Sequence, residues 1–115
     1  MIMIEYPKCS TCQKAKKYLE NKSCEFIDRD IVKNTPSKDE LNEIIKKSGK
    51  EVNKFFNTSG LKYKELKLKD KLPKMTYEEK IELLASDGML IKRPLLILDE
   101  DVLIGFKEKE WENIK

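Results

Sequence analysis

The chain has 115 residues, a formal net charge of +3 and equal shares, 39%, of hydrophobic and charged residues, which predicts one small soluble domain with a heavily charged surface. Because 24 basic and 21 acidic residues are intermixed, the charge balance argues against direct binding to nucleic acid. The absence of histidine excludes every histidine-based catalytic dyad or triad and most zinc sites.

The chain carries no sign of a membrane segment. No apolar run approaches the roughly 18 residues that span a bilayer, and "MIMIEYP" is short and lacks the basic start of a signal peptide. Three cysteines, an odd number, argue against a framework of structural disulfides. We therefore expect a cytoplasmic monomer that does not bind membranes.

The first third of the chain predicts a β-α-β unit. Residues 1–6 form a short apolar run that ends at Pro7, as a buried strand would. From Ser10 to Lys22 the apolar residues recur at helical spacing, which predicts an amphipathic helix. Residues 24–32 alternate enough to predict a second strand, which opens with Cys24 as a buried structural residue.

A helical block follows. Ser37 and Glu40 have the spacing of a capping box at the start of a predicted helix within residues 34–49. Short helices are expected next, and Thr76 and Glu79 repeat the capping-box spacing ahead of a further helix.

The end of the chain predicts a β-β-α unit. Residues 95–98 and 102–104 are apolar runs separated by three acidic residues, which favours a hairpin, and a short helix around Trp111 closes the chain. The whole order predicts an α/β fold with a four-stranded mixed sheet between helices. The helical block at about residues 35–88 is then an insertion between the two halves of a single domain over residues 1–115.

The pair Cys9-x-x-Cys12 lies where the first strand gives way to the first helix. There, free backbone N–H groups and the helix dipole favour a thiolate at Cys9, and Lys8 adds positive charge. Cys12 follows one turn later on the same face of the helix, where it could attack a mixed disulfide formed at Cys9. The spacing thus favours a nucleophilic cysteine and a resolving cysteine.

Two other readings of the pair stay open. Two cysteines three apart could be inert residues of a core helix. A zinc site needs four ligands, and beyond the pair only Cys24 remains, so a metal would require a site shared across a dimer. We expect no metal.

The stretch Lys92-Arg93-Pro94 is the second candidate. A proline at this place belongs at the first position of a strand or in a cis turn. Arg93 could hold a thiolate or a nearby anion through a forked hydrogen bond, or it could be a surface arginine beside a strand. The spacing does not decide between the two.

Together, "YPKCSTCQKAKKYLE" and "IKRPLLI" resemble the arsenate reductase/Spx family, a branch of the thioredoxin-like fold with a helical insertion. The resemblance covers essentially the whole chain. It implies that Cys9 is the catalytic or redox-sensing cysteine and that Cys12 is the second cysteine of the Spx-like members. It also implies that Arg93 faces Cys9 and lowers its pKa, and that Pro94 is the cis-proline that shapes the substrate groove.

The chain also departs from the family's arsenate reductases. Their histidine just upstream of the cysteine is replaced by Glu5 or Tyr6, and the places of two further arginines fall near Asn57 and Phe106. With one arginine, the site would match the charge of arsenate only in part. Gly49 lies close to the place of an important glycine in the Spx-like regulators.

The resemblance favours a thiol–disulfide oxidoreductase with no bound cofactor. Its partners would be a small thiol or disulfide substrate and an electron donor, either glutathione with glutaredoxin or thioredoxin. The alternative is a redox-sensing regulator that binds the α subunit of RNA polymerase, as Spx-like proteins do. A second alternative is an arsenate reductase that depends on glutaredoxin or thioredoxin.

Overall fold

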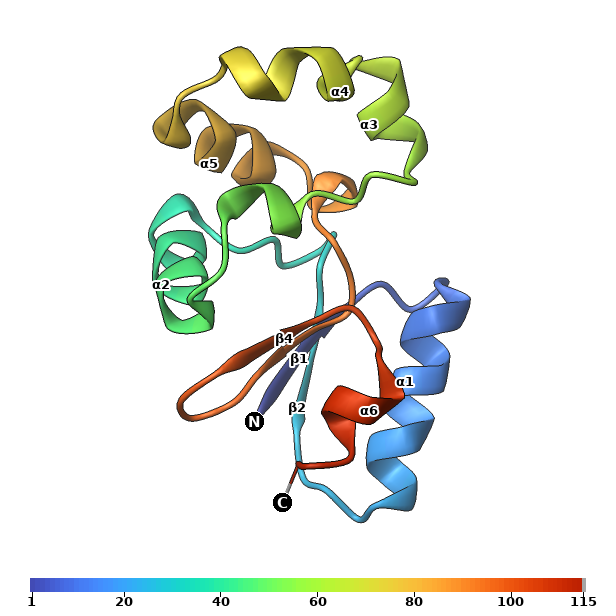
Figure 1. The fold of residues 1–115 in the computed structure, drawn as a ribbon. Coiled ribbons are helices and arrows are strands. Elements are labelled where there is room, and N and C mark those ends of the chain that lie inside the picture. Colours follow the sequence, from blue (N-terminus) through green and yellow to red (C-terminus); the bar gives the residue numbers. More distant parts are fainter. Residues whose placement is uncertain (115) are drawn as a thin grey trace.

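A four-stranded mixed sheet lies at the centre of the computed structural model, which describes residues 1–114 (Figure 1). Strand β1 (Ile2–Glu5) is parallel to β2 (Ile27–Asp30) and antiparallel to β3 (Leu95–Ile97), which pairs with β4 (Val102–Ile104). The strand order is therefore β2-β1-β3-β4, with β2 at one edge. This arrangement confirms the expected mixed sheet in an α/β fold.

Helices cover both faces of the sheet. The α-helices are α1 (Ser10–Asn21), α2 (Lys38–Ser48), α3 (Leu61–Glu65), α4 (Leu68–Lys71), α5 (Tyr77–Ser86) and α6 (Glu108–Trp111), with 3-10 turns at Val52–Phe55, Leu72–Lys74 and Gly88–Leu90. Helices α1 and α6 lie on one side of the sheet and α2 on the other, while α3, α4 and α5 form a group beyond one end of it (Figure 1). None of the helices described is long and apolar enough to cross a membrane.

The alternating side chains of β1 supply both apolar cores. Met3 packs with Cys12, Leu19 and Trp111 under α1 and α6. Ile4 points the other way and packs with the helices of the insertion, among them α2 and α5. The sheet is thus buried on both faces.

The predicted helix caps are present. The Ser37 side chain accepts a hydrogen bond from the Glu40 backbone N–H at 3.2 Å, and the Glu40 carboxylate accepts one from the Ser37 N–H at 3.1 Å. Thr76 and Glu79 form the same reciprocal pair at the start of α5. Gly49 ends α2 with a φ of 66°, in the left-handed region that favours glycine.

The second strand is shorter than predicted, because it begins at Ile27 and not at residue 24. The Cys24 backbone N–H donates to the Leu19 carbonyl at 3.0 Å, so it closes α1 and does not join the sheet. At the other end, the Asp30 carboxylate accepts from the backbone N–H groups of Val32 and Lys33, which turns the chain away. Local hydrogen bonds therefore limit this edge strand at both ends.

Candidate active site

Cys9 is the N-cap residue of α1. Its backbone is extended, with φ −82° and ψ 124°, and its sulfur accepts a hydrogen bond from the Cys12 backbone N–H at 3.4 Å. The Cys9 carbonyl accepts the first helical bond, from the Gln13 N–H, at 3.0 Å. A sulfur in this position faces the free N–H groups and the positive end of the helix.

Cys12 lies in a different environment from Cys9. Its side chain is completely buried within the core under α1, whereas Cys9 is half-buried, and both thiols are free. Burial raises the pKa of the Cys12 thiol to about 12, and the neighbouring Cys9 and Glu5 raise it further, against the effect of the Tyr6 backbone N–H. Cys12 is therefore held as a neutral thiol below the surface.

Arg93 acts on Cys9 from the segment before β3. Burial alone would raise the pKa of the Cys9 thiol, but hydrogen bonds from Cys12 and Arg93, with the charge of Arg93, outweigh it and lower that pKa. The guanidinium lies 5.2 Å from the centre of the Tyr6 ring. Its Nε and Nη1 atoms are buried without a hydrogen-bond partner among the described residues. Arg93 thus lines the pocket beside Cys9 with two N–H donors that no described residue satisfies.

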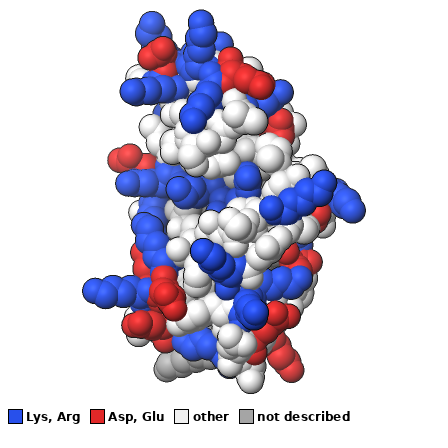
Figure 2. All heavy atoms as spheres, turned by 90° about the vertical axis from the view of Figure 1, so that its right-hand side faces the viewer, with Lys and Arg blue, Asp and Glu red and all other residues white. Residues whose placement is uncertain are grey.

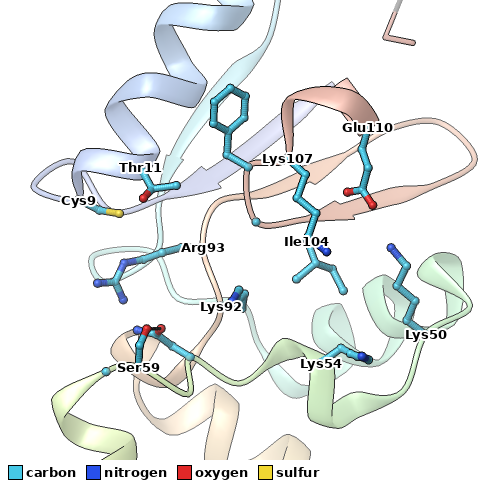
Figure 3. Close-up of a pocket in the computed structure, with 14 residues that line it drawn as sticks. Cys9, Thr11, Lys50, Lys54, Ser59, Lys92, Arg93, Ile104, Lys107 and Glu110 are labelled. Atoms are coloured by element: carbon cyan, nitrogen blue, oxygen red, sulfur yellow. Dashed lines mark hydrogen bonds between the residues drawn. The ribbon is translucent and has the colours of Figure 1, made fainter. Parts of the chain in front are cut away.

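A pocket of about 660 Å³ opens beside Cys9 (Figure 3). Residues 55–57 run beside residues 90–92, where the Lys92 N–H donates to the Phe55 carbonyl at 2.7 Å and the Asn57 N–H to the Leu90 carbonyl at 2.8 Å. This pairing brings the start of the helical insertion to the segment that carries Arg93. The side chains of Cys9 and Arg93 lie at one end of the view, with Lys50, Lys54 and Glu110 at the other.

Four lysines join Arg93 around this pocket, namely Lys50, Lys54, Lys92 and Lys107. Lys and Arg side chains gather across the middle of the face shown in Figure 2, between the end of the molecule with α3 and α4 and the end with α1 and α6. Lys92 belongs to the stretch Lys92-Arg93-Pro94 that the sequence singles out, whereas Lys50, Lys54 and Lys107 were not predicted to join the site. Asn57 and Phe106, which lie near the places of two further arginines in the family's arsenate reductases, both line the pocket. Lys54 and Lys107 lie close to these two residues in the sequence.

The sequence also singled out Pro94, Cys24 and Gly49. The Arg93–Pro94 peptide bond is cis, as the resemblance implies, and Pro94 is buried with its carbonyl accepting from the Gly105 N–H at 2.8 Å. Cys24, which was predicted to be buried, is half-buried and lies just beyond the end of α1 that is opposite Cys9. Gly49 is exposed, and its role in ending α2 accounts for it.

The described residues contain no group of three or more histidine, cysteine, aspartate or glutamate side chains that could hold a metal ion. The structure instead places a half-buried thiol and an arginine in a pocket lined by cations, with a buried thiol in the core one helical turn away.

Residues 4–114 match the ArsC family. The chain belongs to the ArsC family. This confirms the resemblance noted in the sequence, because the match covers nearly all of the chain, including both cysteines of the pair and Arg93.

Curated relatives of this ArsC-family chain carry different names. YusI of Bacillus subtilis, an uncharacterized protein, is 56% identical over 93% of this chain and 91% of its own length. The regulatory protein MgsR of Bacillus subtilis is 30% identical over 91% of this chain and 82% of its own length. The family relationship thus extends to a protein named as a regulator.

Solved structures confirm the ArsC-type fold. An ArsC family related protein from Bacteroides fragilis has a TM-score of 0.95 and 54% identity, covering 99% of this chain and 96% of its own. A protein from Streptococcus mutans described as a possible arsenate reductase has a TM-score of 0.86 and 44% identity, covering 96% of each chain. The expected thioredoxin-like architecture with a helical insertion agrees with these neighbours.

Proposed function

We propose that this ArsC-family protein is a thiol–disulfide oxidoreductase. The observation that carries the proposal is the asymmetry of the pair, since the Cys9 sulfur caps α1 at a pocket while Cys12 lies fully buried one turn away. A thiolate is the nucleophile in disulfide exchange, and hydrogen bonds and positive charge favour the thiolate at Cys9.

In the first step, the Cys9 thiolate attacks one sulfur of a substrate disulfide. A bond forms between Cys9 and that sulfur, the substrate S–S bond breaks, and the other half leaves as a thiolate. In the second step, the Cys12 sulfur attacks Cys9, which releases the second thiol and leaves a Cys9–Cys12 disulfide. An external thiol donor, glutathione with glutaredoxin or thioredoxin, then reduces the pair and restores both thiols.

The cations of the pocket support an anionic substrate or donor. Arg93 offers unpartnered N–H donors beside Cys9, and Lys50, Lys54 and Lys107 extend the positive charge along the same cavity. Arginine and lysine donors bind carboxylates and other oxyanions through charge-assisted hydrogen bonds. We place the reaction in the cytoplasm, where a reversible pair of free thiols is kept reduced.

The test is the reduction of a small disulfide by the wild type and by three single variants. Cys9→Ser should abolish turnover, while Cys12→Ser should still form a mixed disulfide on Cys9, detectable by mass spectrometry, and should fail to release it. Cys24→Ser is the matched control, because Cys24 lies at the other end of α1, and it should retain activity. Turnover by Cys9→Ser at the wild-type rate would overturn the proposal.

Two alternatives predict different results in the same preparation. The relative MgsR, named as a regulatory protein, supports the alternative that this chain is a redox-sensing regulator. That alternative predicts no turnover and capture of the RNA polymerase α subunit only by the oxidised protein. The cation-lined pocket and the Streptococcus mutans neighbour support an arsenate reductase. That reading predicts formation of arsenite from arsenate with a thiol donor, with loss of the activity in Arg93→Ala.

A further inference from the structure

The aromatic ring of Tyr6, the residue after β1, has no role in the reaction above. The guanidinium carbon of Arg93 lies 5.2 Å from the centre of this ring. A guanidinium at this distance is attracted by the negative face of an aromatic ring. The Tyr6 ring is therefore a binding partner of the arginine that acts on Cys9.

The pairing of β1 with β3 brings these two side chains together. The ladder between the two strands ends with Ile4 opposite Leu95. The same register, continued by two residues, sets Tyr6 opposite Arg93. Opposite residues of an antiparallel pair place their side chains on one face. Ile4 and Tyr6 both pack with the core under the insertion, as alternate residues of one strand do.

The other arginine of the chain shows what this contact leaves available. The Arg29 guanidinium donates to both carboxylate oxygens of Glu40, at 2.7 and 3.0 Å, and its Nε donates to the Asn34 carbonyl at 2.9 Å. Arg93, by contrast, forms no ion pair with a carboxylate of residues 1–114, and its Nε and Nη1 atoms have no hydrogen-bond partner there. Arg29 has its charge matched and its donors used, whereas Arg93 does not.

An aromatic ring holds a guanidinium without using its N–H donors. The attraction acts through the face of the ring, whereas the N–H groups lie in the plane of the guanidinium and point outward. A carboxylate in the same place would accept these donors and match the charge. It would therefore compete with Cys9, because a hydrogen bond from Arg93 and its charge both favour the Cys9 thiolate.

Tyr6 also belongs to the turn that carries Cys9. The Tyr6 carbonyl accepts a hydrogen bond from the Cys9 backbone N–H at 3.0 Å, and the half-buried Tyr6 side chain packs against the core under the insertion. One short turn, residues 6–9, thus fixes both the ring and the sulfur. An arginine held on this ring is held in place relative to the Cys9 sulfur.

We infer that Tyr6 is a positioning residue, whose ring face holds the Arg93 guanidinium beside the Cys9 sulfur and leaves the N–H donors of that guanidinium to the thiolate and to an anion in the pocket. The inference rests on the function proposed above, since Cys9 is the nucleophile that Arg93 serves. Without the ring, the long arginine side chain would spread over more rotamers, and its contact with Cys9 would weaken.

The test is the pH dependence of Cys9 alkylation in the reduced full chain, followed by mass spectrometry. Tyr6→Leu keeps an apolar side chain and removes the ring, so the midpoint should rise and alkylation below the midpoint should slow about two- to fivefold. The rate at high pH, where Cys9 is fully ionised, should be retained. Tyr6→Phe keeps the ring face and should stay within about 1.5-fold of the wild type at every pH. Tyr6→Met is a second ring-free variant and should behave as Tyr6→Leu does.

Two further comparisons separate a positioning role from a packing role. In an Arg93→Ala background, Tyr6→Leu should have no further effect on the midpoint, because the arginine that the ring holds is gone. Tyr63→Leu is the matched control, since Tyr63 is also half-buried, packs against the same core and lies outside the pocket lining. It should leave the midpoint unchanged. Urea unfolding checks that each variant is folded at the pH values used.

The outcomes also separate this inference from the proposed function. An unchanged midpoint in the ring-free variants, or an equal shift with and without Arg93, would overturn the role of Tyr6. Equal slowing at every pH would overturn it as well, because that result indicates altered access to Cys9 and not altered ionisation. Alkylation needs no substrate disulfide, so these outcomes do not depend on turnover. Disulfide reduction by Cys9→Ser at the wild-type rate would instead overturn the proposed function.

Discussion

Single side chains give the two cysteines of the pair opposite properties, although they are three residues apart. Cys9 receives hydrogen bonds and the charge of Arg93, and Cys12 is enclosed by the core under α1. Sequence spacing predicted this division, because a residue before a helix and a residue one turn into it differ in exposure. The properties of Glu5 could not be predicted, because its burial depends on the packing of α1 against β1 and β2.

At this scale we predict that Glu5 gives the protein a stability that falls as the pH rises toward neutrality. The pKa of its carboxyl group is about 7 in the folded protein and ordinarily 4.5, so the folded state holds a proton that the unfolded chain releases. The resulting stability is present below about pH 4.5 and is lost as the pH rises through about 7, with a slope of up to about 1.4 kcal/mol per pH unit. Glu5→Gln should flatten this decline.

Urea unfolding at several pH values measures this effect. The pair of Glu40 and Arg29 provides an internal contrast, because hydrogen bonds from that arginine hold the pKa of Glu40 at about 2. Its contribution is present above about pH 4.5 and is lost as the pH falls toward 2. Glu40→Gln should therefore lower the stability by a constant amount above about pH 4.5 and change its pH dependence only on the acid side. Between about pH 5 and 7, roughly the range in which Glu5 acts, the free energy of unfolding should fall more steeply in the wild type than in Glu5→Gln. Identical slopes in the two proteins would contradict the raised pKa of Glu5.

Among the elements, the helices followed their sequence signals more closely than the strands. The capping boxes at Ser37 and Thr76 were predicted and are present, because both partners are local. The second strand was predicted too long, since its ends depend on contacts with Leu19 and on the turn after Asp30. Such contacts are absent from the alternation of residues 24–32.

The cap of α2 provides the prediction at the scale of elements. Ser37→Ala removes the hydrogen bond that the Ser37 hydroxyl accepts from the Glu40 N–H, and it weakens the position of the Glu40 carboxylate at the start of the helix. The free energy of unfolding should therefore fall by about 1 kcal/mol. Urea unfolding of this variant checks the value. Ser10→Ala, at an exposed position in the first turn of α1, is the control and should change stability by less than about half as much. Equal losses in the two variants would contradict the cap's contribution.

The molecule as a whole builds its cationic pocket from segments far apart in the sequence. Cys9 belongs to the first half, Lys50 and Lys54 to the insertion, and Lys107 to the segment after β4. The resemblance brought Cys9, Cys12 and Arg93 into one site. It could not supply the lysines, because their approach depends on how residues 55–57 pair with residues 90–92.

This pocket predicts a preference for anionic disulfides. The double variant Lys50→Glu and Lys54→Glu should lower kcat/KM for oxidised glutathione about three- to tenfold at low salt, with a smaller effect on uncharged hydroxyethyl disulfide. The matched control reverses Lys69 and Lys71, which are exposed on α4 and lie outside the pocket lining. Equal losses for both substrates, or an equal loss in the control, would contradict charge selection by the pocket.

The central claim is that Cys9 is the ionised thiol of the pair, and the pH dependence of its alkylation tests this most directly. Mass spectrometry of the full chain after brief alkylation measures how the reaction rate of Cys9 rises with pH. The midpoint of this rise should lie below that of free cysteine, about 8.5. Arg93→Ala should raise the midpoint and slow the alkylation of Cys9 at neutral pH. Lys92→Ala, next to Arg93 in the same pocket, is the matched control for loss of a nearby charge and should shift the midpoint less. A midpoint at or above that of free cysteine, unchanged in Arg93→Ala, would contradict the account.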